Sequence, residues 1–232
     1  VTIACACAGI IIGSVFVSGL GLKFTQSVID LSGGVLFILL CLTAISAIIL
    51  GMGMTTTAVY ITVAALIVPS LIESGIMPIA AHMFAFYFGV VSTITPPVAL
   101  ASFAGAAIAK SPPMSTAVES SKVGIAKYIV PFAFVYNPSL LMEGPIIWSI
   151  YSLISVLLAY WCMTLGLEGW FNGKLNAFKR TLALIGSVAL LIPPLQNIYG
   201  IDGIYYNFIG VLILMMIYYL QGKLNFKLKA ST

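Results

Sequence analysis

The stretch LSGGVLFILLCLTAISAIILGMGMTTTAVYITVAALIVPSLI, residues 31–72, contains no charged side chain. About 20 consecutive apolar residues are needed for a helix to cross the hydrocarbon core of a membrane, and this stretch is long enough for two passes. Its centre, GMGMTTT at residues 51–57, is rich in glycine and hydroxyl groups. The stretch therefore predicts two apolar helices joined by a polar turn.

The composition of the whole chain also indicates a membrane protein. Of its 232 residues, 61% are hydrophobic and 7% are charged, whereas soluble domains carry about 25% charged residues. Val1 lies inside an apolar run, which indicates a piece of a longer polypeptide. We expect an all-α, polytopic integral membrane protein without a separate soluble domain.

The apolar helical segments are separated by short charged connections. Lysines gather at residues 110–127, at residues 168–180 and after residue 221, while the alternate connections carry Glu143 and Asp202. Because short cytoplasmic loops accumulate Lys and Arg, the lysine-rich set and the C-terminus are expected to be cytoplasmic. A surface helix is expected at residues 112–122, and the predicted apolar helices are residues 3–20, 31–50, 56–72, 79–94, 98–109, 123–142, 145–166, 181–198 and 204–221.

Two arrangements of residues 31–73 are compatible with these charges. Two complete spans would place the turn in the cytoplasm, where a Lys or Arg would be ordinary, but the turn has none. A re-entrant hairpin would instead place the turn within the membrane, where such backbone is tolerated if it is buried in protein or faces a wet cavity. The chemistry of the turn favours the re-entrant helical hairpin.

Residues 79–109 are too long for one straight span and too short for two. Their middle contains Pro96 and Pro97, which remove two backbone donors and disfavour the preceding helical turn. The sequence therefore predicts a discontinuous transmembrane helix, made of two half-helices that together cross the membrane once.

Both interruptions are candidate binding points, because broken helices near the midplane hold ions and substrates in secondary transporters. Hydroxyl and carbonyl oxygens suit a hard cation such as sodium, and helix N-termini attract a carboxylate. The alternative is that Ser and Thr only pack helices together. The strongest sodium candidates are Gly51, Thr56 and Thr95, and the full candidate set is Gly51, Gly53, Thr55, Thr56, Thr57, Ser92, Thr93, Thr95, Pro96 and Pro97.

These residues carry a family resemblance. GMGMTTTA at residues 51–58, Pro69 and TPPVAL at residues 95–100 resemble the second hairpin and second unwound helix of the large membrane (permease) subunit of TRAP transporters. The run VPFAFVYNPSLL at residues 130–141 resembles the next helix of the variety in which the small and large subunits are fused. Residues 1–142 would then form the second half of the transport domain, and residues 143–232 additional C-terminal transmembrane helices.

The resemblance implies sodium-coupled uptake of an organic acid, such as a C4-dicarboxylate, across a prokaryotic inner membrane. The implied partners are an extracytoplasmic substrate-binding protein, the N-terminal half of the permease and the small membrane subunit. No organic cofactor is expected, with Na⁺ as the coupling ion.

Other function classes are less compatible with the residues present. An enzyme would need grouped acidic, His or Cys residues, which six scattered acids and a single His do not provide. A non-catalytic structural subunit and a proton-coupled carrier remain as alternatives. His82 is the one candidate for a proton, and it lies near the predicted outer start of its helix.

Overall fold

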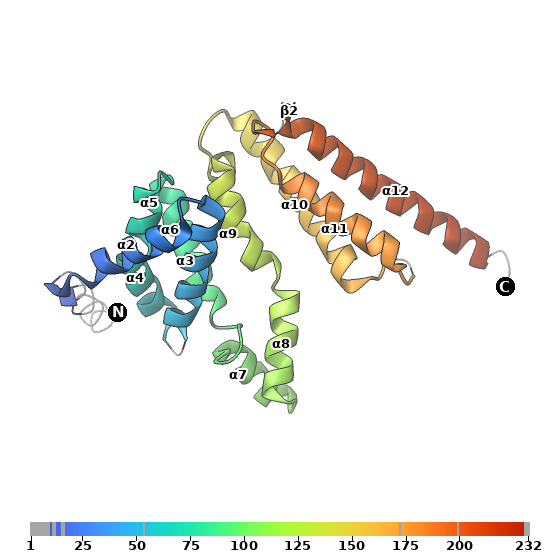
Figure 1. Ribbon diagram of the computed structural model, residues 1–232. Helices are drawn as coiled ribbons and strands as arrows, with labels where there is room; N and C mark the ends of the chain where they lie inside the picture. Colours follow the sequence, from blue (N-terminus) through green and yellow to red (C-terminus); the bar gives the residue numbers. More distant parts are fainter. Residues whose placement is uncertain are drawn as a thin grey trace. The chain divides into compact units, whose positions relative to one another are not determined.

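The computed structural model describes residues 10, 13–14, 17–52, 54–171, 173–198 and 200–229 (Figure 1). Contacts divide the chain into two compact units, Val1–Pro138 and Ser139–Thr232. Both units are built from helices, so the all-α class is confirmed. The assignment of the first unit to a transport domain stays a prediction.

The first unit is organised around the helix α6 (Pro78–Val91), which packs against α3, α4, α5 and α9. Its buried positions are mostly small, including Ala81, Ala85 and Gly89, so neighbouring backbones can approach closely. The other helices of this unit are α2 (Leu20–Ser32), α3 (Leu36–Gly51), α4 (Thr56–Leu66), α5 (Val68–Glu73), α7 (Leu100–Ala109), α8 (Pro113–Val123) and α9 (Ala126–Tyr136), followed at the unit boundary by the short 3₁₀ helix Pro138–Leu141.

Aromatic rings pack α9 against α6. The ring of Phe132 lies 5.4 Å from that of Phe84 and 5.8 Å from that of Phe88, both nearly edge-on. Such edge-to-face pairs add about 0.5–1.5 kcal/mol beyond the burial of their area. They hold α9 beside the end of α6, where the predicted break begins.

The second unit consists of α10 (Ile146–Glu168), α11 (Ala177–Leu191) and α12 (Gly203–Lys229), with α11 packed against both of the others (Figure 1). A Cβ added to Gly210 would lie 2.9 Å from the carbonyl oxygen of Gly186, so these glycines mark a close crossing of α11 and α12. A two-residue antiparallel hairpin, β1 (Asn197–Ile198) and β2 (Ile201–Asp202), connects them.

The C-terminal end of α10 is capped by a charged side chain. Arg180 donates from Nε to the Gly166 carbonyl at 2.9 Å and from a terminal guanidinium nitrogen to the Leu167 carbonyl at 2.7 Å. Carbonyls in the last turn of a helix lack intrahelical partners, and the helix dipole favours a cation there. This contact fixes the connection between α10 and α11.

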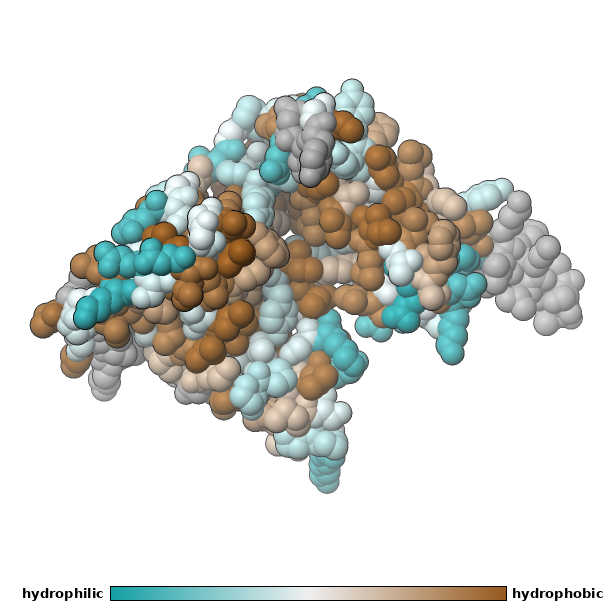
Figure 2. All heavy atoms as spheres, in the orientation of Figure 1, coloured by the Kyte–Doolittle hydropathy of each residue, from teal (hydrophilic) through white to brown (hydrophobic). Residues whose placement is uncertain are grey.

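Two described helices, Ile146–Glu168 and the Gly203–Gln221 part of α12, are long and apolar enough to cross a membrane. Apolar side chains are also exposed on both units, as the brown atoms of Figure 2 show. Exposed apolar surface of this extent is typical of a surface covered by lipid or by another protein.

Prolines explain where the helices differ from the predicted segments. The segment 56–72 is divided near Ile67, just before Pro69. The segment 123–142 ends at Tyr136, because Asn137 leaves the helical conformation ahead of Pro138. The segment 181–198 becomes a helix that ends at Leu191, shortly before Pro193 and Pro194. The helix α2 was not predicted as a separate element.

Candidate functional site

The first candidate region is the turn between α3 and α4. Helix α3 ends at Gly51, and Met52 is already extended, with φ −65° and ψ 121°. Thr55 is also extended, at φ −70° and ψ 151°, and its carbonyl accepts the amide of Val59 at 2.9 Å to begin α4. The candidate residue Gly53 lies outside the described residues. The structure therefore has two helices joined by a short turn at the predicted hairpin.

The second candidate region is the segment between α6 and α7. Helix α6 ends at Val91 and α7 begins at Leu100, with turns in between and a cis peptide bond between Pro96 and Pro97. The Ala101 amide donates to the Thr93 carbonyl at 3.0 Å, which closes the segment on itself. The helix is interrupted where the two prolines predict it, whereas a single membrane crossing by both halves stays a prediction.

Hydroxyl groups of this segment donate hydrogen bonds to carbonyls in the last turn of α6. Ser92 Oγ donates to the Gly89 carbonyl at 2.6 Å, Thr93 Oγ1 to Val90 at 2.8 Å and Thr95 Oγ1 to Val91 at 2.7 Å. A hydroxyl has one proton and two lone pairs, so each oxygen that donates its proton to the helix keeps acceptor capacity. These bonds are compatible with a structural role and with cation ligation.

A direct contact joins the two regions. Ser92 Oγ lies 3.1 Å from the carbonyl oxygen of Gly51, 41 positions earlier in the chain, and both residues are buried. A Cβ on Gly51 would overlap Ser92 Oγ and lie 2.7 Å from Ser92 Cβ, while a Cβ on Gly89 would lie 2.8 Å from Val59 Cγ1. Gly51 and Gly89 therefore allow the end of α3, the start of α4 and the end of α6 to pack closely together.

The threonines of the turn are placed differently. The side chains of Thr55, Thr56 and Thr57 are exposed, and none forms a hydrogen bond with a described residue. Thr56 opens α4, where backbone N–H groups have no intrahelical acceptor. Of the candidates in the turn, Gly51 contacts the second region through Ser92. Among the described residues, the hydroxyl of Thr95 is bonded to Val91 and Tyr128 and not to Thr56.

Helices α8 and α9 also contact the interrupted segment. Tyr128 on α9 places its hydroxyl 2.6 Å from Thr95 Oγ1, and Ser121 on α8 donates to the Ile94 carbonyl at 3.0 Å. Neither Ser121 nor Tyr128 was a candidate from the sequence, because the contacts span 27 and 33 positions and no local pattern indicates them.

An open cavity of about 320 Å³ adjoins the same segment. Its lining residues are Pro96, then Val118, Ser121 and Lys122 of α8, Ile125 just before α9, and Tyr128 of α9. Lys122 forms an exposed ion pair with Glu119 at 3.0 Å, a type of pair that contributes about 0–1 kcal/mol.

A further hydroxyl, that of Ser102 in the first turn of α7, is buried and has no hydrogen-bond partner in the described part of the chain.

His82 contacts an aromatic residue and no acid. Its Nδ1 lies 3.1 Å from the hydroxyl of Tyr60 on α4, and the imidazole is exposed. Over the described residues, no three His, Cys, Asp or Glu side chains come together in a way that could hold a metal ion. The oxygens of the two candidate regions come from hydroxyls and backbone carbonyls.

Comparison with known proteins identifies a family. A family model described as "Tripartite ATP-independent periplasmic transporter, DctM component" matches residues 1–148. No curated protein and no solved structure matches the chain. The matched range includes both candidate regions and the helices that support them.

Proposed function

The chain belongs to the family of the DctM component of tripartite ATP-independent periplasmic transporters, and from that membership we propose that it couples uptake of an organic acid to sodium. The family makes the chain a permease component of a transporter in a prokaryotic inner membrane, and it is not a family of enzymes. The proposal adds the coupling ion, the carboxylate substrate and delivery by an extracytoplasmic binding protein.

The observation that carries the proposal is the hydrogen bond between Ser92 and Gly51. It joins the end of α6, beside the predicted break, to the end of α3, at the predicted hairpin turn, and both places are rich in uncharged oxygen. Transporters with discontinuous helices bind ions and substrates at such junctions, where carbonyls released from a helix can coordinate a cation.

The lengths of the helices support a re-entrant hairpin and a discontinuous span. Helix α3 has 16 residues, which at 1.5 Å per residue is about 24 Å, short of the hydrocarbon core of about 30 Å. Helix α6 has 14 residues and α7 has 10; these are about 21 and 15 Å, so neither crosses alone but the two together are long enough.

The available side chains favour sodium over a proton as the coupling ion. In the described part of the first unit, the acids Asp30, Glu73 and Glu119 are exposed, and each lies outside the two candidate regions. His82 is bonded to Tyr60 rather than to either region. Sodium needs only neutral oxygens, which Gly51, Thr56 and Thr95 would supply.

A carboxylate substrate fits the helix starts that follow each region. Helix α4 begins directly after the turn and α7 begins three residues after Pro97, and neither has a side-chain cap on its first amides. Free N–H groups and the positive end of the helix dipole favour an anion there. Bound sodium nearby would strengthen that attraction, which couples the two ligands.

Uptake into proteoliposomes tests the proposal. The complete transporter that contains this chain is reconstituted with its binding protein, and accumulation of labelled succinate, a C4-dicarboxylate, is measured under an inward sodium gradient. We expect accumulation that requires both sodium and the binding protein. Equal accumulation under a proton gradient in choline buffer would contradict sodium coupling and favour a proton-coupled carrier, and transport by a complex lacking this chain would favour a structural subunit.

A further inference from the structure

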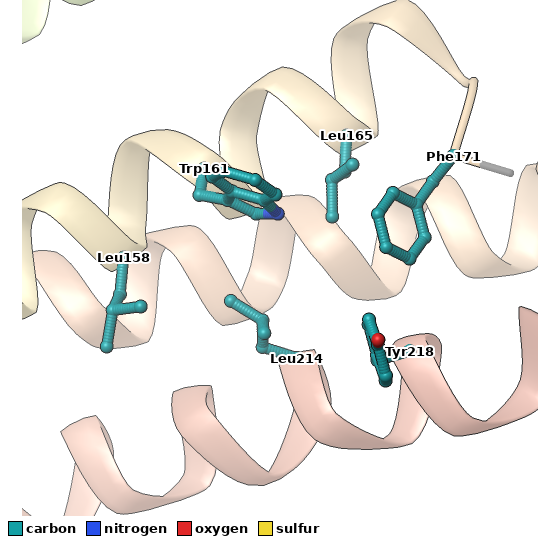
Figure 3. Close-up of a pocket in the computed structure, with 6 residues that line it drawn as sticks. All are labelled: Leu158, Trp161, Leu165, Phe171, Leu214 and Tyr218. Atoms are coloured by element: carbon teal, nitrogen blue, oxygen red, sulfur yellow. The ribbon is translucent and has the colours of Figure 1, made fainter. Parts of the chain in front are cut away.

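An apolar groove lies between the two candidate spans of the second unit. Helix α11 packs against both α10 and α12, and the direct gap between α10 and α12 remains open as a cavity of about 540 Å³. Figure 3 shows side chains of both helices directed toward this gap. The lining residues are Leu158, Trp161, Leu165, Phe171, Leu214 and Tyr218.

The rim of the groove is exposed on the surface of the unit. Trp161 is 58% exposed and Tyr218 is 64% exposed. Both helices are apolar enough to cross a membrane, so their exposed faces meet hydrocarbon rather than water. An occupant of the groove must therefore be apolar along the length from Leu158 to Phe171.

One end of the groove is closed by a cationic connection. The rings of Phe171 and Tyr218 lie 5.7 Å apart at that end. Gln221, which is buried, accepts from Lys179 Nζ at 2.9 Å and donates to the Lys174 carbonyl at 3.5 Å, so the connection is tied to α12.

The charges at this end are unequal. Lys174, Lys179 and Arg180 supply three cations, against the single carboxylate of Glu168. The exposed Trp170 is also in this connection, and Trp with Lys is typical of the boundary between hydrocarbon and headgroups. An anionic phospholipid fits both features, because its acyl chain is apolar like the groove and its headgroup is opposite in charge to the cations at one end.

We propose that the groove between α10 and α12 binds one acyl chain of an anionic phospholipid, with its phosphate beside Lys174 and Lys179. The chain fills the space along Leu158, Trp161 and Leu214. The phosphate accepts hydrogen bonds from ammonium groups, which are stronger than neutral ones. An apolar helix of another protein would fill the groove without neutralising the cations, so the charge distribution favours the lipid.

Fluorescence of Trp161 tests the proposal, because this side chain lies in the groove (Figure 3). The whole chain with Trp148→Phe and Trp170→Phe is reconstituted in vesicles, and quenching by phosphatidylglycerol brominated on its acyl chains is compared with quenching by brominated phosphatidylcholine. We expect stronger quenching by the anionic lipid. Lys174→Gln should lower the relative affinity for it about fivefold, since each lysine near an anionic surface contributes about 1 kcal/mol.

Matched variants separate the groove from the general surface. Lys127→Gln removes an exposed lysine of the first unit and should leave the lipid preference unchanged. Leu214→Phe narrows the groove and should reduce quenching by the anionic lipid, whereas Leu212→Phe, at an exposed position of the same helix outside the lining, should not. Equal quenching by both lipids would overturn the proposal, and so would an unquenched Trp161, because another polypeptide segment would then occupy the groove.

Discussion

Gly51→Ala should disrupt the junction between the α3–α4 turn and the end of α6. The added Cβ would overlap Ser92 Oγ, lie 2.7 Å from Ser92 Cβ and lie 3.2 Å from Val59 Cγ1. Ser92 cannot turn away without giving up the hydrogen bond that its one hydroxyl proton shares between the Gly51 and Gly89 carbonyls. Overpacking of this kind costs about 1–3 kcal/mol, and losing the hydrogen bond costs about 0.5–1.5 kcal/mol.

The same substitution at an open glycine is the control. Gly105 lies inside α7, and a Cβ there would meet nothing within 4 Å. Gly105→Ala should stabilise the helix by about 0.5–1 kcal/mol, because alanine has less backbone freedom to lose. The two variants therefore make the same chemical change, but Gly51→Ala should lower the free energy of unfolding and Gly105→Ala should raise it.

The assay is chemical unfolding of the purified protein in detergent, together with succinate uptake by the complete transporter. Gly51→Ala should lower the free energy of unfolding and reduce uptake at an unchanged membrane level. The double variant Gly51→Ala with Ser92→Gly restores the space for the methyl group and should recover part of the stability. If Gly51→Ala matched Gly105→Ala in both measurements, the close approach of the two regions would be wrong.

Three further predictions concern the support of Thr95, the cap of α10 and the orientation of the chain in the membrane. Tyr128→Phe removes the hydroxyl that lies 2.6 Å from Thr95 Oγ1. It should raise the sodium concentration for half-maximal uptake while the amount of protein in the membrane stays normal. An unchanged sodium response would exclude Tyr128 as a positioning residue. Arg180→Gln removes the charged cap of α10 and should destabilise the second unit by about 1.5–3 kcal/mol in chemical unfolding. Arg180→Lys should have a stability between those of the unchanged protein and Arg180→Gln. Equal stability of all three proteins would contradict the capping. A cysteine introduced at Asn176 in a background without other cysteines should react with an impermeant thiol reagent only from the cytoplasmic side, and labelling from outside intact cells would reverse the orientation.

The sequence predicts the helices well where a local signal ends them. Proline explains the ends of α9 and α11, and the twin prolines 96 and 97 predict the break after α6. Periodicity and charge do not separate α2 from its neighbours, because Lys23 and Asp30 resemble a connection although they lie in a helix. Local composition therefore predicts interruptions better than it predicts short amphipathic helices.

The candidate site could be predicted only in part for a related reason. Gly51 and Ser92 were candidates because each lies at a predicted interruption, and the structure brings them together. Tyr128 and Ser121 contact the same segment through packing of α8 and α9. Their positions depend on long-range contacts, such as that of Phe132 with Phe84, which no single segment of the sequence encodes.

The sodium dependence of uptake by threonine variants tests the central claim most directly. Thr56→Ala and Thr95→Ala each remove one proposed sodium ligand, while Thr164→Ala removes a hydroxyl that binds the Tyr160 carbonyl in α10 and serves as the matched control. In the reconstituted complete transporter, the first two variants should require more sodium for half-maximal uptake at a normal membrane level, and Thr164→Ala should not. An unchanged sodium response in both Thr56→Ala and Thr95→Ala would contradict a sodium site at the turn and the break.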